Sequence, residues 1–295
     1  MTVPLVTPET PVLIQGATGR AGRRHAVLMR DYGTNIVAGV SPRTDAGDID
    51  GIPVFATCAD AVAATGATAS VVIVRPTEVC DAVFEALDAG ISLLVTVAEG
   101  VPVADCIDVL ERVRAAGARW IGASTPGIAI PGRLKMGVLP AVSLAPGPLG
   151  LMSKSGTLSY EVGYRLVGRG IGQSLWVGVG GDMVKGTRFA DLIPFFDADP
   201  ETKAMLLIGE VGGTEEEDFA AAYQELGAQK PVYAIVAGST TREGIAMGHA
   251  GALIHGTSGT IEAKTRALEA AGARVFTRIR DIVDAIAADF PAAAG

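Results

Sequence analysis

Histidine, cysteine and basic residues are scarce in this sequence, and each scarcity excludes a class of function. The 295 residues include three histidines and three cysteines, and 32 acidic against 24 basic residues give a formal net charge of -8. No stretch concentrates Lys and Arg, so attraction to a phosphate backbone is not expected. Cys58, Cys80 and Cys106 lack metal-ligand or redox spacing and are predicted to be reduced thiols within helices. We therefore expect no nucleic-acid partner and no metal ligands in this chain.

Long apolar runs and targeting signals are also missing. The longest uncharged run, residues 136–153, is interrupted by Pro140, Pro146 and Pro148, whereas a membrane-spanning helix needs about 20 apolar residues. The first eleven residues lack the basic and apolar regions of a secretory signal. The sequence therefore predicts no membrane segment and a cytoplasmic protein.

A third absence concerns nucleoside triphosphates. The sequence contains no Gly-Lys pair, so it lacks the G-x-x-x-x-G-K-[ST] phosphate loop. A phosphoryl donor of the reaction would have to bind elsewhere.

Two rounds of alternating strands and helices make up the chain, which is the pattern of parallel sheets in the α/β class. In the first round, strands are predicted at 12–15, 35–40, 69–74, 93–96 and 119–121, and helices at 21–32, 58–65, 79–89 and 103–116. In the second, strands are predicted at 149–153, 175–179, 204–208, 232–236 and 274–276, and helices at 156–169, 188–197, 215–226, 261–271 and 280–289. A Gly- and Pro-rich crossing, 122–148, separates them. We expect an N-terminal Rossmann-like domain at 1–125 and a flavodoxin-like, doubly wound parallel-sheet domain at 126–295.

A glycine-rich turn follows the first predicted strand. Gly16, Gly19 and Gly22 form a G-x-x-G-x-x-G pattern that leads directly into a helix. Missing side chains let a pyrophosphate approach the backbone, and the helix N-terminus offers free N–H groups. After the second strand Arg43 stands where an NAD-binding domain would carry an acidic residue, which favours a phosphorylated ribose. CoA and NADP both fit this pattern.

His249 lies among small residues in the sequence MGHAGA, after a predicted strand. Its small neighbours leave the imidazole reachable, so a reactive histidine and a structural loop histidine are both consistent with the spacing. His25, inside the first helix, and His255, after an apolar step, are predicted to be structural or exposed.

Two further segments fit a reactive His249. The sequence SKSGTLSYE, residues 153–161, is a strand end that turns into a helix with hydroxyl and N–H groups suited to a phosphoryl group. Glu210 ends another strand of the same domain, and the carboxyl ends of such strands share one crevice. Glu210 is therefore predicted to accept a proton from one ring nitrogen of His249, so that the other nitrogen attacks phosphorus. A helix-capping carboxylate is the alternative for Glu210.

Taken together, these motifs resemble the alpha subunit of the succinyl-CoA synthetase (succinate-CoA ligase) family over nearly the whole chain. The motifs that carry the resemblance are the GATG turn, VAEGVP at 97–102, SKSGTLSYE, VGGD at 179–182, IGEVGG at 208–213 and GHAGA at 248–252. The resemblance implies that His249 is phosphorylated and that Glu210 supports it. It also implies a contact with the carboxylate substrate at Tyr160 and a CoA site whose members are Thr18, Gly19, Arg20, Ala21, Arg43, Thr44, Val97, Ala98 and Glu99. The phosphate-binding candidates in the SKSGT turn are Ser153, Ser155, Gly156 and Thr157.

The resemblance further implies a heteromeric ligase of the tricarboxylic acid cycle. An ATP-grasp beta subunit would bind ATP or GTP with Mg²⁺ and phosphorylate His249, a small dicarboxylic acid would become an acyl phosphate, and CoA would then attack it.

The sequence departs from the family pattern at three places. Thr44 stands where the family has Lys, residues 123–127 read ASTPG instead of PNCPG, and Met183 replaces a Pro. These positions lie near the CoA and acid regions, so a malate-CoA ligase subunit is an alternative to a succinate-specific one. An NADP-dependent reductase would leave His249 and Glu210 without a role, and a regulatory protein without ligase activity would not need them.

Overall fold

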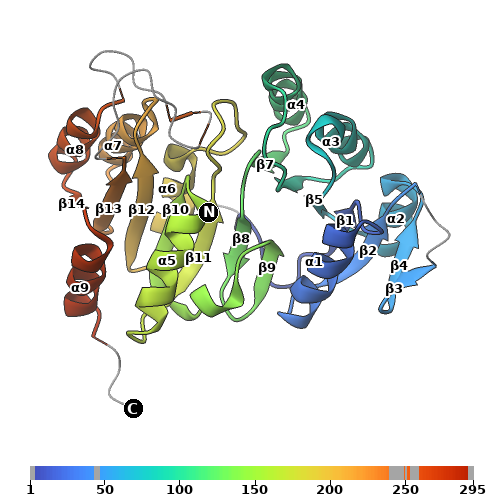
Figure 1. Cartoon of the computed structure of the whole chain (residues 1–295), viewed down its shortest axis with the longest axis horizontal. Coiled ribbons are helices and arrows are strands. Elements are labelled where there is room, and N and C mark those ends of the chain that lie inside the picture. Colours follow the sequence, from blue (N-terminus) through green and yellow to red (C-terminus); the bar gives the residue numbers. More distant parts are fainter. Residues whose placement is uncertain (1–3, 43–46, 239–248, 250, 253–258, 292–295) are drawn as a thin grey trace. The chain divides into compact units, whose positions relative to one another are not determined.

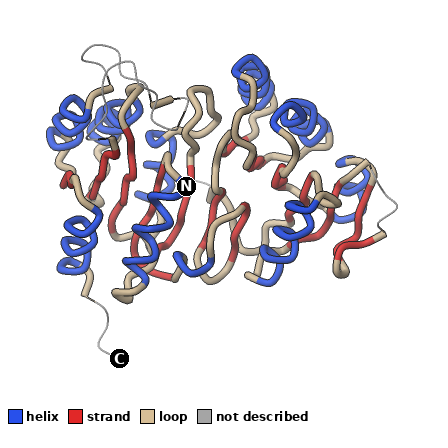
Figure 2. Tube along the Cα trace, in the orientation of Figure 1, coloured by secondary structure: helices blue, strands red, loops and turns tan. Residues whose placement is uncertain are grey.

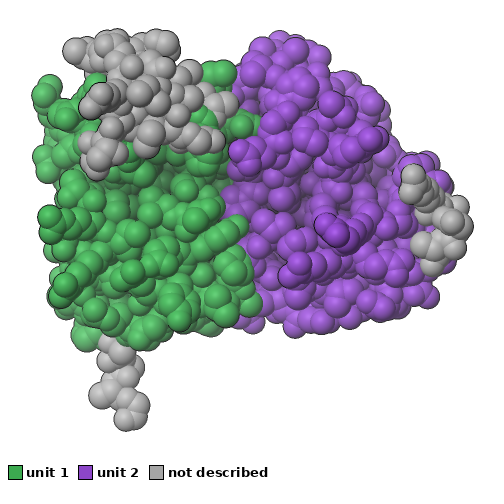
Figure 3. All heavy atoms as spheres, viewed as in Figure 1, with its two compact units in different colours: residues 1–5, 140–183, 188–295 green, residues 6–139, 184–187 purple. Residues whose placement is uncertain are grey.

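A computed structural model describes residues 4–42, 47–238, 249, 251–252 and 259–291. The chain divides into two compact units (Figure 3). The N-terminal unit comprises Val6–Leu139 and Val184–Thr187, and the C-terminal unit comprises the described residues of 1–5, 140–183 and 188–295. The main segment of the N-terminal unit ends at Leu139, and that of the C-terminal unit begins at Pro140. The predicted domain boundary between residues 125 and 126 stays a prediction.

The N-terminal unit is a Rossmann-like α/β unit. Its sheet has the strand order β3-β4-β2-β1-β5-β6-β7, in which every neighbouring pair is parallel except β3 and β4. The strands are β1 (Val12–Gln15), β2 (Ile36–Val40), β3 (Asp48–Ile49), β4 (Ile52–Phe55), β5 (Ala69–Val72), β6 (Leu93–Thr96) and β7 (Arg119–Ile121). The helices are α1 (Arg20–Asp31), α2 (Cys58–Thr65), the 3-10 turn η2 (Pro76–Glu78), α3 (Val79–Asp88) and α4 (Val103–Ala115). Apart from the edge strand β3, this is the 3-2-1-4-5-6 order of dinucleotide-binding folds.

Local chemistry accounts for these elements. β1, β5 and β6 are buried at every position, as expected for strands covered by helices on both faces. α2 begins where Thr57 accepts a hydrogen bond from the N–H of Asp60, and it ends at Gly66, whose φ of 70° is left-handed. Cys58 and Cys106 are buried and Cys80 is partly buried, and all three lie within helices, as predicted.

Two pairs of short strands were not predicted from the sequence. One is β3 with β4, and the other is the antiparallel hairpin of β8 (Gly127–Ile130) and β9 (Leu134–Gly137) in the Gly- and Pro-rich crossing. In the hairpin, a Cβ on Gly127 would lie 2.0 Å from the carbonyl oxygen of Met136, so the backbones approach more closely than side chains allow. Glycine is unfavourable in the interior of a strand, so the sequence pattern did not indicate β8. In the folded chain the same glycine permits β8 to pair with β9.

The C-terminal unit contains five parallel strands in the order β14-β13-β12-β10-β11. They are β10 (Pro146–Ser153), β11 (Gln173–Gly178), β12 (Ala204–Glu210), β13 (Val232–Ala237) and β14 (Arg274–Phe276). The helices are the 3-10 turn η3 (Ala141–Ser143), α5 (Gly156–Val167), α6 (Phe189–Ala198), α7 (Glu215–Glu225), α8 (Ile261–Ala270) and α9 (Ile279–Asp289). Numbered in chain order, the strands lie 2-1-3-4-5, which is the flavodoxin-like order that the sequence predicted. Figure 2 shows the helices and strands of the chain in separate colours.

Helix packing in the C-terminal unit follows from this order. α5 packs against α9, while α7 packs against both α6 and α8 (Figure 1). α5 connects β10 to β11 in one direction along the sheet, and α6 connects β11 to β12 in the opposite direction. Because both crossovers are right-handed, α5 and α6 lie on opposite faces of the sheet. The core between them includes Trp176, Phe189, Phe196 and Phe219, which expose at most 1% of their surface. Burial of each such side chain contributes roughly 1.5–3 kcal/mol.

Among the described residues, no helix is both long enough and apolar enough to span a membrane.

Candidate functional site

The reversal of strand order in the C-terminal unit defines the first candidate site. β10 is the first strand of this unit and β12 the third, and they are direct neighbours, with Ser153 opposite Ile208. The chain leaves their carboxyl ends in opposite directions, and ligands of doubly wound sheets bind at such a switch point. Lys154 and Glu210 lie at these two strand ends, where the N–H of Lys154 donates to the carbonyl of Ile208 at 3.1 Å.

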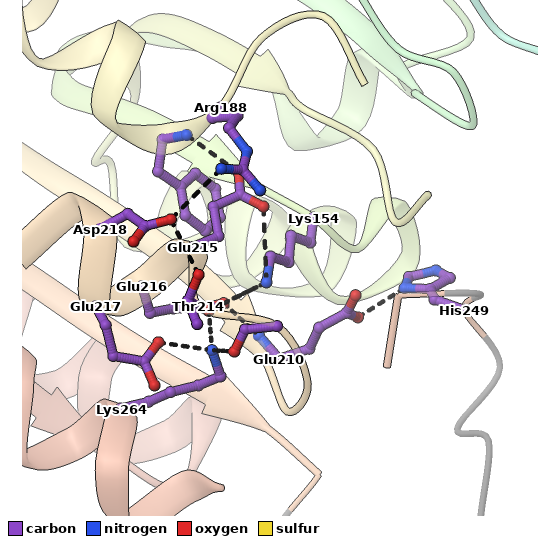
Figure 4. A network of polar contacts seen from close by, with 12 residues as sticks. Lys154, Arg188, Glu210, Thr214, Glu215, Glu216, Glu217, Asp218, His249 and Lys264 are labelled. Atoms are coloured by element: carbon purple, nitrogen blue, oxygen red, sulfur yellow. Dashed lines mark hydrogen bonds and ion pairs between the residues drawn. The ribbon is translucent and has the colours of Figure 1, made fainter. Parts of the chain in front are cut away.

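His249 and Glu210 contact each other directly. Nδ1 of His249 lies 2.6 Å from Oε2 of Glu210, and the two side chains expose 25% and 9% of their surface (Figure 4). A neutral imidazole that donates its Nδ1 proton to this carboxylate keeps the lone pair of Nε2 for another partner. The arrangement can therefore present a nucleophilic Nε2 on a partly exposed ring.

Gly181, in the loop after β11, forms the wall beside this imidazole. A Cβ built on Gly181 would lie 2.4 Å from Cγ and 2.5 Å from Nδ1 of His249, so the ring occupies the place of a side chain. The carbonyl of Gly181 also accepts the N–H of Gly251 at 3.1 Å. The VGGD motif thus contacts the histidine motif through its second glycine.

Buried charges lie beneath Glu210. Oε1 of Glu216 accepts the backbone N–H of Glu210 at 3.0 Å, and the same carboxylate pairs with Lys154 at 2.9 Å and with Lys264 at 2.5 Å (Figure 4). Burial by itself raises the pKa of Glu216, but Lys154 and Lys264 outweigh it, so that the pKa lies below its usual value. Gly209 leaves room for this carboxylate, because a Cβ there would lie 2.4 Å from Oε1 of Glu216.

The SKSGT segment forms the start of α5. The Ser155 hydroxyl caps the helix by accepting the N–H of Leu158 at 3.3 Å, and the Ser153 hydroxyl donates to the carbonyl of Ser155 at 2.8 Å. Gly156 and Thr157 are the first two residues of the helix, and Thr157 is exposed. The cap leaves further N–H groups of the first turn available for an anion. The phosphate role of these residues stays a prediction.

Tyr160 lies one turn further along α5 and is partly buried, and burial raises the pKa of its phenol. Its backbone carbonyl accepts the Ser143 hydroxyl at 2.9 Å. At neutral pH the phenol is therefore a neutral hydrogen-bonding group, and its substrate role stays a prediction.

The glycine turn of the N-terminal unit forms the second candidate site. A Cβ on Gly22 would lie 2.1 Å from the carbonyl oxygen of Gly16, so glycine is needed for the turn to close onto α1. The Thr18 hydroxyl lies 2.7 Å from that of Ser41 at the end of β2. Gly19 precedes α1, and Arg20 and Ala21 begin it; all three are exposed.

Val97, Ala98 and Glu99 follow β6, at the same carboxyl edge of the sheet as the glycine turn after β1. The N–H of Val97 donates to the carbonyl of Val72 at 3.3 Å, and Glu99 is exposed. The structure therefore brings the two predicted CoA segments to one edge of one sheet.

The other predicted residues have mixed outcomes. Arg43, Thr44 and His255 lie outside the described residues. His25 lies within α1, as predicted, and burial together with Arg24 and Lys135 lowers its pKa.

Sequence reasoning missed the cluster of Lys154, Glu216 and Lys264 and the contact of Gly181. The only signal for the cluster was the run of acidic residues at 215–218, which reads equally well as a favourable first turn of a helix.

A Rossmann-like unit with a closed glycine turn, followed by a flavodoxin-like unit with a His–Glu pair at its switch point, is the arrangement expected of a CoA ligase. Family models agree with this class: residues 7–100 match the CoA binding domain, and residues 152–274 match the CoA-ligase model. The N-terminal unit is therefore the CoA-binding part. Of the two ligands that the glycine-rich turn left open, CoA and NADP, this match favours CoA.

Curated relatives narrow the class. The chain is 46% identical to the alpha subunit of succinate-CoA ligase [ADP-forming] of Aquifex aeolicus, over 96% of this chain and 93% of that protein. It is 44% identical to alpha subunit 2 of the Archaeoglobus fulgidus enzyme, over 96% and 98%. A third relative, at 40% over 93% and 94%, is the ADP-forming sulfoacetate-CoA ligase subunit SauD of Bilophila wadsworthia. The chain belongs to the alpha-subunit family of the succinate-CoA ligases.

Solved structures share the fold. ATP citrate lyase of Methanothrix soehngenii, in complex with citrate and coenzyme A, superposes with a TM-score of 0.82 at 24% identity, over 95% of this chain and 50% of that one. An acetyl-coenzyme A synthetase of Ca. Korarchaeum cryptofilum gives 0.76 at 21% identity, over 94% and 60%. The two-unit architecture therefore extends beyond the succinate-CoA ligases.

Proposed function

We propose that this alpha subunit carries a phosphoryl group on His249 while succinate, or a related small acid, is joined to CoA. The observation that carries the proposal is the 2.6 Å contact of Nδ1 of His249 with Glu210, which leaves Nε2 as the nucleophile. The supporting context is the switch-point location and the capped start of α5 beside it.

The first step transfers the γ-phosphoryl group of a nucleoside triphosphate to Nε2 of His249. The N–P bond forms as the bond to the nucleoside diphosphate breaks, and the carboxylate of Glu210 stabilises the positive charge on the imidazole through Nδ1–H. The triphosphate comes from an ATP-grasp beta subunit, because this sequence has no phosphate loop of its own. Mg²⁺ bound with the nucleotide on that subunit would neutralise phosphate charge.

The remaining steps return His249 to its starting state. A substrate carboxylate oxygen attacks the phosphorus, which forms an acyl phosphate and frees the imidazole. The CoA thiol, as its thiolate, then attacks the acyl carbon and releases inorganic phosphate. Two transfers with good leaving groups thus replace one direct condensation of acid and thiol. We expect this reaction in the cytoplasm, with ATP as the donor because the named relatives are ADP-forming.

Succinate is the favoured acid because the relatives at 44–46% identity are named for it. The relative named for sulfoacetate suggests that the subunit type accommodates other small acids with a second anionic group. Malate stays the alternative, since the departures at residues 123–127 and Met183 lie near the acid region that the family resemblance implies.

Phosphorylation is tested by co-expressing the chain with its beta partner and supplying ATP labelled at the γ-phosphorus. We expect acid-labile, base-stable label on this chain, and none on a His249→Asn variant. His25→Asn removes a histidine of the other unit and should label normally. Label that persists on the His249→Asn chain contradicts the proposal.

Substrate choice is tested separately with the same complex. Succinate, malate and sulfoacetate are compared by kcat/KM for CoA-dependent release of inorganic phosphate. A preference for malate or sulfoacetate over succinate would replace the favoured acid without affecting the role of His249.

A further inference from the structure

Several buried charged side chains at the switch point, Lys154, Glu216 and Lys264 among them, have no part in the phosphoryl transfer just described. Glu216 and Lys264 expose none of their surface, and Lys154 exposes 5%. They come from α7, α8 and the loop between β10 and α5, and they meet beneath the end of β12 (Figure 4). We call Lys154, Glu216 and Lys264 the buried clamp.

The clamp fastens both ends of the turn that begins with Glu210. At the first end, Oε1 of Glu216 accepts the backbone N–H of Glu210 at 3.0 Å. At the second, Nζ of Lys264 donates to the carbonyl of Gly213 at 2.9 Å. The carboxylate of Glu216 is itself held by both lysines, so its oxygens have few alternative positions. This buried carboxylate therefore holds the backbone from which the Glu210 side chain extends.

Stability alone does not explain such a cluster. Removing ions from water is costly, and an apolar set of the same volume is often as stable or more stable. Burial lowers the pKa of Lys154, but Glu216, Glu215 and more weakly Glu210 raise it overall. The charge of Lys154 thus interacts with the carboxylate that contacts His249, which connects the clamp electrostatically to the reacting group.

We propose that the clamp is a set of positioning residues for phosphoryl transfer, in which Glu216 orients Glu210 and thereby keeps the Nδ1 proton of His249 on the side of Glu210. This inference rests on the proposed phosphohistidine, but the tautomer of the imidazole reports on it even without phosphorylation. A fold-only role would leave that tautomer unchanged in any variant that folds.

The test variant is Lys154→Met/Glu216→Met in the complex with the beta subunit. The double change removes one positive and one negative charge, and methionine approximates the length of both side chains, so folding is expected to survive. Lys264 keeps Glu217 as a partner at 2.9 Å. The matched control is Arg169→Met/Asp284→Asn, which removes an exposed ion pair of 2.7 Å elsewhere in the same unit. Circular dichroism and thermal unfolding establish that both variants fold.

Two measurements follow. Rapid-quench labelling should show the rate constant for phosphorylation of His249 falling about ten- to hundredfold, with KM for ATP within about twofold of the parent. Two-bond ¹⁵N–¹H correlation spectra should show the imidazole of His249 changing from the Nδ1–H tautomer to a mixture of tautomers. This chain contributes few imidazole signals because it has three histidines. The control should leave both unchanged.

A folded Lys154→Met/Glu216→Met variant with the parental tautomer and the parental rate overturns the inference. If the parent itself takes up no label, the proposed function fails, and the tautomer comparison alone decides the inference. If the double variant does not fold, Glu216→Gln is measured in the same way, because it keeps the size of the side chain and removes the charge that holds the two lysines.

Discussion

Replacing Gly181 with alanine tests whether the position of the His249 ring controls its reactivity. The new Cβ would lie 2.4 Å from Cγ of the ring, whereas an ordinary contact begins at 3.4 Å. The imidazole must therefore move by about 1 Å, because packed atoms do not overlap. Since the ring is partly exposed, it can move without unfolding the unit.

The size of the effect follows from the hydrogen bond to Glu210. Displacement by about 1 Å would stretch the contact of 2.6 Å to roughly 3.6 Å, at which it is no longer a hydrogen bond. A hydrogen bond to a charged group contributes about 1.5–3 kcal/mol. That loss corresponds to a roughly ten- to hundredfold smaller population of correctly oriented imidazole, and we expect the phosphorylation rate to fall by the same factor.

The assay is single-turnover labelling of the complex by γ-labelled ATP, with the ring tautomer followed by NMR. Gly168→Ala is the matched control, since its Cβ would meet no atom closer than 3.5 Å and its backbone is already helical. A Gly181→Ala chain that labels at the parental rate with the parental tautomer would refute the argument from ring position.

Three further predictions concern other parts of the chain. Gly22→Ala, whose Cβ would lie 2.1 Å from the carbonyl oxygen of Gly16, should weaken CoA binding and destabilise the N-terminal unit by about 1–3 kcal/mol; thermal unfolding with and without CoA measures both, and a parental CoA-induced shift contradicts it. Burial and the nearby Glu85 raise the pKa of the Cys58 thiol to about 12, so Cys58 should resist thiol reagents at pH 8 until the protein unfolds; mass mapping of labelled native protein would detect the opposite. Because the folded-state pKa of Glu216 lies below its usual value of 4.5, its ionisation stabilises the fold above about pH 4.5 and that contribution is lost as pH falls toward the lower value; Glu216→Gln should flatten the pH dependence of unfolding in acid, and an unchanged slope would exclude this carboxylate.

Long regular elements were predictable because their signals are local. The predicted strand at 12–15 and helix at 58–65 coincide with β1 and α2, since apolar β-branched runs and the Thr57 cap act over a few residues. The β8–β9 hairpin was missed because its pairing depends on a close approach of Gly127 to Met136 across the turn, which no local pattern announces.

For the candidate site too, some features could be predicted from the sequence and others could not. His249 and Glu210 could be selected from the sequence, because a histidine among small residues and a carboxylate at a strand end are local features of a doubly wound fold. Their contact through Nδ1, the wall formed by Gly181 and the support of Glu216 by two lysines join residues from six segments of the chain.

The sequence by itself indicated the class of the protein, its two α/β units and its candidate reactive histidine, because hydrophobic periodicity and short motifs lie in consecutive residues. Only the tertiary structure decided which imidazole nitrogen faces Glu210 and what holds Glu210 in place. Those facts depend on distances between strand ends and helix starts, which the folded sheet sets and the order of residues along the chain does not.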